Sequence, residues 1–409
     1  MIASLAYIFL LGLAFAAVCT KLKLPRIIGM LAAGIILGPY ALNMLDTSVL
    51  AVSADLRKIA LIIILLKAGL SLNLSDLKKV GRPAVMMSFV PACFEILAYM
   101  LFAPYILGIT KIEAAVMGAV MSAVSPAVVI PRMSMLMDNG YGTKKSIPQL
   151  IMAGASCDDI FVIVLFSAFT GMAQGGTANV YDFIGIPISI ILGVVLGSAA
   201  GICMGMFFEN ANKRGRYIRN SMKVIIVLGI SFILVSVETW TENIIPISGL
   251  LAVVGMACAL KIKCVPSVTK RLSEKFGKLW IAAEVILFVL VGAAVDIRYT
   301  MGAGIAAVGM ILTALIFRCI GVFICVIGTE LNRKERLFCI ISYLPKATVQ
   351  AAIGAVPLAM GLPCGKLVLS VSVLGILITA PLGAIGIDMT YEKLLDKSES
   401  LQKHDDYEF

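Results

Sequence analysis

The chain has 409 residues, of which 60% are hydrophobic and only 14% are charged. A mean hydropathy of +1.01 indicates a polytopic helical membrane protein and excludes a soluble enzyme with a large core. The strand-and-turn rhythm of a β-barrel is missing, which leaves helices as the spanning structure. The net charge of +10 does not indicate a nucleic-acid partner, because the basic residues follow a pattern typical of membrane topology.

Apolar runs separated by basic breaks predict thirteen transmembrane helices with short loops between them. The first run lacks a basic start and a small-residue cleavage site, so it predicts a retained helix rather than a signal peptide. The expected helices are 1–20, 27–45, 57–73, 83–108, 112–137, 147–171, 183–208, 221–238, 243–261, 279–297, 301–328, 335–360 and 366–389.

Lysines and arginines concentrate in every second break between the expected spans, as the positive-inside rule requires. With the N-terminus outside, 26 of the 34 basic residues fall in inward breaks or the tail, and five fall in outward breaks. The other three, Lys67, Arg318 and Lys346, lie inside apolar runs. This bias predicts an outside N-terminus and a cytoplasmic tail at 390–409.

Two of the expected helices carry a proline beside polar residues near their centres. Ser125-Pro126 lies in the fifth span and Pro345-Lys346 in the twelfth. Proline removes a backbone donor and clashes with the carbonyl four residues earlier, so each helix is expected to break there. The two interruptions lie seven spans apart, and an odd offset places two repeats of the chain in opposite orientations in the membrane. Paired interruptions at corresponding positions of inverted repeats indicate a midplane transport site. Two ordinary kinked helices are the alternative.

The sixth expected span contains two adjacent acids, Asp158 and Asp159, with about ten uncharged residues on either side. A central Asp costs about 2.5–3.5 kcal/mol on insertion scales, so the pair is a candidate functional site. Binding a proton or a small cation would remove that cost. Because neighbouring residues diverge by about 100° around a helix, one carboxylate can face the cation and the other the protein. A motif at a water-facing helix end is the alternative.

Further charged residues lie within apolar runs. Glu95 and Arg318 stand in the fourth and eleventh spans, and we expect them to pair, because an unpaired charge in lipid is expensive. Whether the pair is structural or opens on proton or ion binding stays open at this point. Lys346 is expected to neutralise carbonyl ends and carboxylates at its helix break. Lys67 and Glu284 are expected to snorkel or to make contacts between helices.

The cysteines and the histidine do not indicate a resident metal or cofactor. The ten cysteines show no metal-ligand spacing, and most stand within apolar segments. We interpret them as small buried hydrophobic residues. The single histidine, His404, stands in the tail, so a histidine-based metal site is excluded.

Three stretches resemble the monovalent cation:proton antiporters and, within them, the NHA branch, whose members carry an Asp-Asp pair. The stretches are 118–129, 154–160 and 345–352. The similarity runs over essentially the whole chain. It implies an NhaA-like fold with two crossed broken helices, and exchange of Na+ or Li+ for H+ by an elevator-like movement. It also implies a homodimer in the lipid bilayer of a plasma membrane of bacterial type.

The resemblance further implies a division of the single transmembrane unit 1–389. The ion-transporting core would comprise helices at about 83–171 and 301–389. The scaffold that dimerises would comprise helices at about 1–73 and 221–297, and 183–208 would be a linker helix.

Residue roles follow from the same resemblance. Asp159 resembles the main cation ligand and Asp158 its partner, while Ser125 and Thr348 would be polar groups at the crossing. The expected mechanism is competition, in which protons and a dehydrated cation replace one another at the two carboxylates.

Arg318 stands where many Asp-Asp antiporters have a lysine that pairs with the first Asp. An arginine keeps its proton in proteins, which argues against a coupling scheme in which that residue titrates. A glutamate at the position of Glu95, facing this arginine, is a feature that the NHA branch shares. This implies that Arg318 is engaged with Glu95 instead of with Asp158.

Other functions fit the residues less well. A bile-acid or other organic-anion sodium symporter needs a roomier cavity and usually fewer spans. A channel or a potassium-selective relative with regulatory domains would add a nucleotide-binding domain after Asp388. An intramembrane aspartyl protease uses aspartates on two different helices. The sequence leaves Na+, Li+ and K+ open, and K+/H+ exchange is the alternative function.

Overall fold

The computed structural model describes residues 1–22, 24–71, 81–174, 180–215, 218–241 and 247–398. Within these ranges the regular structure is helical, apart from one isolated bridge between Tyr141 and Lys397. The helices in chain order are α1 (Ile2–Lys21), α2 (Arg26–Leu37), α3 (Thr47–Ala51), α4 (Ser53–Ser71), α6 (Arg82–Met87), α7 (Val90–Leu107), α8 (Lys111–Ser122), α9 (Pro126–Asp138), α10 (Ile147–Gln174), α11 (Val180–Lys213), α12 (Asn220–Thr241), α13 (Gly249–Lys263), α14 (Pro266–Ala293), α15 (Ile297–Val326), α16 (Arg333–Ser342), α17 (Thr348–Ile353), α18 (Val356–Ala359) and α19 (Gly365–Leu394).

Nine helical segments of the described chain are long and apolar enough to cross a membrane. Two more apolar helical segments, Arg26–Leu37 (α2) and Thr348–Ala359 (α17 with α18), are shorter. The prediction of an all-helical polytopic membrane protein is therefore confirmed. The nine segments fall short of the thirteen spans that the hydropathy pattern predicts.

Helix α14 begins at Pro266, thirteen residues before the expected start at 279. The added turns bury Thr269, Leu272 and Phe276, while Lys270 is exposed. Buried residues three and four positions apart form one apolar stripe of an amphipathic helix. The basic break that predicted a loop is therefore the polar face of a continuing helix.

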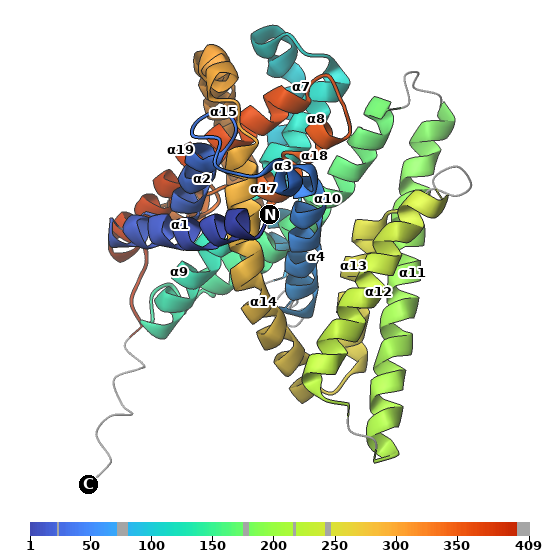
Figure 1. The fold of residues 1–409 in the computed structure, drawn as a ribbon. Helices are drawn as coiled ribbons and strands as arrows, with labels where there is room; N and C mark the ends of the chain where they lie inside the picture. Colours follow the sequence, from blue (N-terminus) through green and yellow to red (C-terminus); the bar gives the residue numbers. More distant parts are fainter. Residues whose placement is uncertain (23, 72–80, 175–179, 216–217, 242–246, 399–409) are drawn as a thin grey trace.

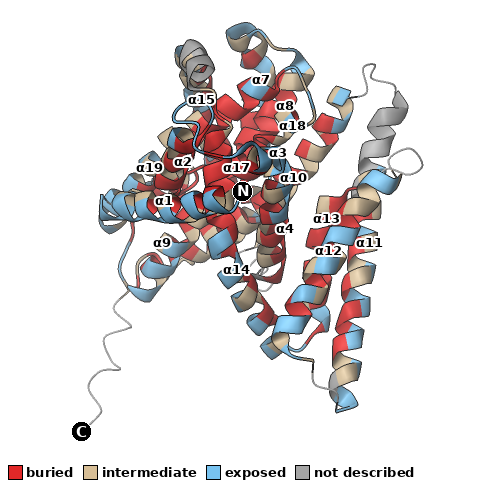
Figure 2. Ribbon diagram, in the orientation of Figure 1, coloured by how far each residue is buried: buried red, intermediate tan, exposed pale blue. Residues whose placement is uncertain are grey.

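The most deeply buried elements are short helices in the middle of the molecule. Every residue of α8 from Ala114 to Ser122 is buried, as are all six residues of α17. Figure 2 shows α8 and α17 in the largely buried centre of the ribbon, and α1, α11 and α12 with exposed faces. A helix that is apolar on all sides belongs in such an interior. The two predicted helix breaks therefore lie inside the protein.

Helices α11, α12 and α13 stand beside the rest of the molecule (Figure 1). Three glycines four residues apart let α11 and α13 approach closely. A Cβ would lie 2.5 Å from Ser248 O at Gly193, 1.9 Å from Ala252 O at Gly197 and 2.4 Å from Met256 O at Gly201. Small residues at this spacing are typical of tightly packed membrane helices.

The segment after α19 pairs with the loop that precedes α10. Gly142 N–H donates to Asp396 O at 2.9 Å, and Ser398 N–H donates to Gly140 O at 2.8 Å. The Lys397 ammonium lies 5.4 Å from the centre of the Tyr141 ring. This C-terminal segment, 395–398, therefore fastens the end of the last helix to the start of the helix that carries the aspartates.

Candidate functional site

The two helix breaks contact each other. Residues 123–125 separate α8 from α9, and residues 343–347 separate α16 from α17. Pro126 is the first residue of α9, where its missing N–H costs nothing, while Pro345 lies within its break. Ser125 N–H donates to Pro345 O at 2.8 Å. Two segments from opposite halves of the chain thereby meet through their backbones.

Side chains supply donors to the carbonyls that the first break frees. Lys346 Nζ donates to Met121 O, and Arg318 Nη1 donates to Ser122 O. Both are cations at the C-terminal end of α8, where the helix dipole favours positive charge. The expectation for Lys346 concerns its own helix break, whereas the carbonyl that it contacts, Met121 O, ends α8 at the first break.

A buried charge network surrounds the break. Arg318 of α15 contacts Glu95 of α7 at 2.9 Å and Asp158 of α10 at 3.2 Å, and its Nε donates to Tyr343 O at 2.6 Å. Lys346 contacts Glu95 at 2.7 Å. All four charged side chains are 0% exposed. The interpretation that Arg318 is engaged with Glu95 instead of with Asp158 is therefore wrong, because the planar guanidinium presents several donors and reaches both acids.

The two aspartates have different surroundings. Asp158 Oδ2 also accepts from Val124 N–H at 2.8 Å, inside the first break. Asp159 makes no ion pair within the described chain, is 7% exposed, and its Oδ1 has no hydrogen-bond partner there. Successive positions on α10 thus place one carboxylate in the charge network and leave the other without a cation.

The structure brings most of the predicted site residues to one region. Ser125 lies in the first break, Thr348 begins α17 after the second, and both are buried. Neither hydroxyl has a hydrogen-bond partner among the described residues. The region therefore combines carboxylates, unpartnered hydroxyls and the free ends of helices.

Sequence reasoning assigned no role to some residues of this region. Gln350 Nε2 donates to Ala123 O at 2.9 Å, and Thr379 Oγ1 accepts from Lys346 N–H at 3.0 Å. Gln350 stands within the third of the stretches that carry the family resemblance, so its position near the break was a usable signal. Thr379 lies in an apolar helix, and nothing in its sequence context distinguishes it.

The other intramembrane charges lie outside this site. Glu284 of α14 is 2% exposed and pairs with Arg26 at the start of α2. This agrees with the expected contact between helices. Among the described residues, no group of three or more His, Cys, Asp or Glu could hold a metal ion.

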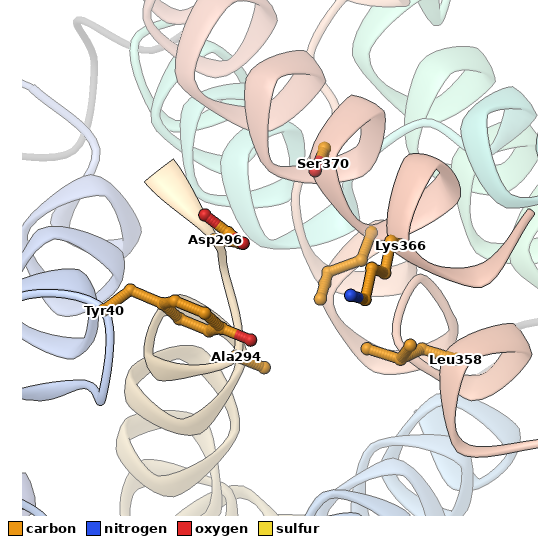
Figure 3. A pocket seen from close by; sticks show the side chains of 7 residues that line it. Tyr40, Ala294, Asp296, Leu358, Lys366 and Ser370 are labelled. Atoms are coloured by element: carbon orange, nitrogen blue, oxygen red, sulfur yellow. The ribbon is translucent and has the colours of Figure 1, made fainter. Parts of the chain in front are cut away.

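A pocket lies between the ends of α2 and α14 and the helices α18 and α19. Figure 3 shows Asp296 and Lys366 on its opposite sides. None of the predicted site residues lines it. The lining residues are Tyr40, Ala294, Asp296, Leu358, Lys366, Leu369 and Ser370.

The fold is that of a polytopic helical membrane protein. The solved structure of the sodium proton antiporter MjNhaP1 from Methanocaldococcus jannaschii at pH 8 matches it with a TM-score of 0.81 at 22% identity. The match covers 96% of this chain and 98% of that one. At this identity the likeness concerns the fold alone.

Sequence comparisons define the family. The model described as "Sodium/hydrogen exchanger, transmembrane" matches residues 5–393. Sodium/hydrogen exchanger 9B2 of Homo sapiens is 34% identical over 396 residues, which is 94% of this chain and 72% of that protein. Sodium/hydrogen exchanger 9B1 of Mus musculus is 31% identical over 403 residues, which is 92% of this chain and 67% of that protein. The chain belongs to the sodium/hydrogen exchanger family, whose members are transporters and not enzymes.

Proposed function

We propose that this protein exchanges Na+ or Li+ for H+ across the membrane, with Asp158 and Asp159 as the shared site. One observation carries the proposal: of the buried side-chain oxygens near the two breaks that have no hydrogen-bond partner within the described chain, four belong to the predicted ion-site residues. They are Asp158 Oδ1, Asp159 Oδ1, Ser125 Oγ and Thr348 Oγ1.

Such oxygens are suited to a small dehydrated cation. A buried acceptor without a donor costs about 1–3 kcal/mol, so each of them gains by binding a cation, and the two carboxylates also gain by binding a proton. Carboxylate, hydroxyl and carbonyl oxygens are the ligands that hard cations prefer. Protons compete for the same carboxylates, and this competition couples the two substrates.

Charge balance supports exchange rather than leakage. The acids Glu95 and Asp158 are matched by the cations Arg318 and Lys346, so Asp159 is the charge of this cluster without a counter-ion. Either Na+ or H+ neutralises it. A core that is empty keeps a buried negative charge, which is expensive to move through an apolar barrier. Only the loaded core crosses, and exchange becomes obligatory.

The proposal includes the finer features that the family resemblance implies. The fold is NhaA-like with thirteen spans, two crossed broken helices and the Asp-Asp pair of the NHA branch. The core at 83–171 and 301–389 moves like an elevator against the scaffold at 1–73 and 221–297, in a homodimer whose C-terminal tail is cytoplasmic. The contact between the breaks supports this, because it joins the two halves of the proposed core.

Proteoliposome flux under an imposed voltage tests the function. With Na+, Li+ and K+ as the cation panel, the unmodified protein should move protons against Na+ or Li+. Asp159→Asn and Asp158→Asn should each abolish this exchange while the protein stays folded, and Asp159→Asn should weaken cation binding more. Asp138→Asn is the matched control, because Asp138 ends α9 at the exposed surface.

Two results would separate the alternatives. Exchange with K+ but not with Na+ would make the protein a K+/H+ antiporter built on the same site. Robust exchange in Asp159→Asn or Asp158→Asn at unchanged cation affinity would rule out the site itself.

A further inference from the structure

The peptide group between Ala123 and Val124, inside the first break, is held at both edges. Its N–H donates to Asp158 Oδ2 at 2.8 Å, and its C=O accepts from Gln350 Nε2 at 2.9 Å. The peptide group is planar and its N–H and C=O point in opposite directions, so fixing one fixes the other. Gln350 of α17 and Asp158 of α10 are therefore connected through a single peptide group.

We propose that Gln350 is a positioning residue for cation exchange, which holds the Ala123 carbonyl and thereby aims the Val124 N–H at Asp158. This inference rests on the proposed function. Because the Gln350 amide donates to backbone carbonyls of the break and of the end of α8, it acts on the carboxylate through the peptide and not directly.

The surroundings dictate the orientation of the Gln350 amide. Its Nε2 lies 2.9 Å from Ala123 O and 3.5 Å from Met121 O, and both of these atoms are acceptors. Only the NH2 group can face them, so the assignment of nitrogen and oxygen does not depend on the choice of rotamer. The side chain is 0% exposed, so water does not compete with the contact to Ala123 O.

The neutral charge of Gln350 distinguishes it from the other two donors at this break. Met121 O and Ser122 O accept from the cations Lys346 and Arg318, whereas Ala123 O accepts from an uncharged amide. A third cation here would stand one peptide from Asp158 and would weaken the binding of Na+ there, because like charges repel. An amide fixes the peptide without adding charge. Groups that are linked by successive hydrogen bonds also polarise one another.

Losing this contact should favour protons over Na+. Asp158 Oδ2 accepts from only two groups in the described chain, Val124 N–H and Arg318 Nη2. Loosening the first destabilises the carboxylate, so protons compete better at a given pH. The charged groups around Asp158 are Asp159 on its own helix, Arg318 from α15, Glu95 from α7 and Lys346 from the second break.

The test compares Gln350→Met with the unmodified protein in proteoliposomes. Methionine keeps the unbranched shape of glutamine and removes the donor. A weakened hydrogen bond to a charged group predicts an apparent KM for Na+ that rises about threefold to tenfold at fixed pH. The pH of half-maximal exchange should rise by about half to one unit, while the maximal rate at saturating Na+ stays within about twofold.

Gln149→Met is the matched control. Gln149 is also a glutamine with an unpartnered side-chain oxygen, but it precedes Asp158 by nine residues, or about 13 Å, along α10. This variant should keep both the KM and the pH profile. Gln350→Asn provides a second variant, since the shorter amide cannot reach Ala123 O and should shift KM in the same direction.

A lowered maximal rate with unchanged KM and unchanged pH profile in Gln350→Met would show a merely structural role and overturn the inference. Equal shifts in Gln149→Met would also overturn it. Absence of Na+ or Li+ exchange in the unmodified protein would instead overturn the proposed function, so the two failures are distinguishable.

Discussion

Replacing Glu95 by glutamine should destabilise the protein more than replacing any exposed partner of an ion pair. Glu95 is the acid shared by two cations, Arg318 at 2.9 Å and Lys346 at 2.7 Å, and all three side chains are 0% exposed. In Glu95→Gln, Arg318 still has Asp158, but Lys346 is left as a buried cation without an acid in contact.

The magnitude follows from the burial. Breaking a buried ion pair by removing one partner costs about 3–5 kcal/mol. An unfolding entropy of about 2.1 cal/mol/K per residue, over a chain of 409 residues, converts this to a fall in Tm of about 3–6 °C. In Arg318→Gln, Glu95 keeps its contact with Lys346, so losing its contact with Arg318 should cost less free energy of unfolding. The double variant Glu95→Gln/Arg318→Gln should recover only part of the loss, because Lys346 stays without its acid and Asp158 loses its cation.

The assay is thermal unfolding of the purified protein in detergent. Asp388→Asn is the control, because Asp388 pairs with Arg132 at 3.0 Å but is 46% exposed. An exposed pair contributes at most about 1 kcal/mol, so this variant should lose about 1 °C or less. A Tm for Glu95→Gln as high as that of Asp388→Asn would refute the reasoning. Strictly additive effects of Glu95→Gln and Arg318→Gln would show that the two residues are not partners.

Two further predictions concern topology and packing. A cysteine placed at Gln174 should react with an impermeant reagent from outside and one at Arg214 from inside, and the reverse pattern would contradict the predicted orientation. Gly197→Ala should lower stability by about 1–3 kcal/mol in thermal unfolding, because its Cβ would meet Ala252 O at 1.9 Å. Gly229→Ala, with no atom within 4 Å of the added carbon, should be neutral or stabilising.

The sequence predicted the helical class of the protein because hydropathy over 20 residues depends on the bilayer and not on tertiary contacts. It predicted helix ends less well. The basic stretch before residue 279 resembles a loop in composition, yet its buried Leu272 and Phe276 continue α14. Whether a lysine-rich stretch is a loop or the polar face of a helix depends on what packs against it.

The chemistry of the site was predictable, but its connections were not. Two adjacent aspartates in an apolar run carry a free-energy cost of insertion into the bilayer, which any fold must offset. The contact of Arg318 with Asp158 joins residues 160 positions apart, and that of Gln350 with Ala123 joins residues 227 apart. Such contacts depend on how the two breaks meet, and residue type and spacing within one helix carry no information about them.

The C-terminal segment 395–398 gives this protein a natural attachment point for a probe. Because Ser398 and Asp396 pair with the backbone of Gly140 and Gly142, a label at residue 398 reports on the loop that leads into α10 and not on a free tail. A fluorophore or spin label there would register displacement of the aspartate-bearing helix without altering any residue of the ion site. The second label of the pair belongs on α13, which packs against α4.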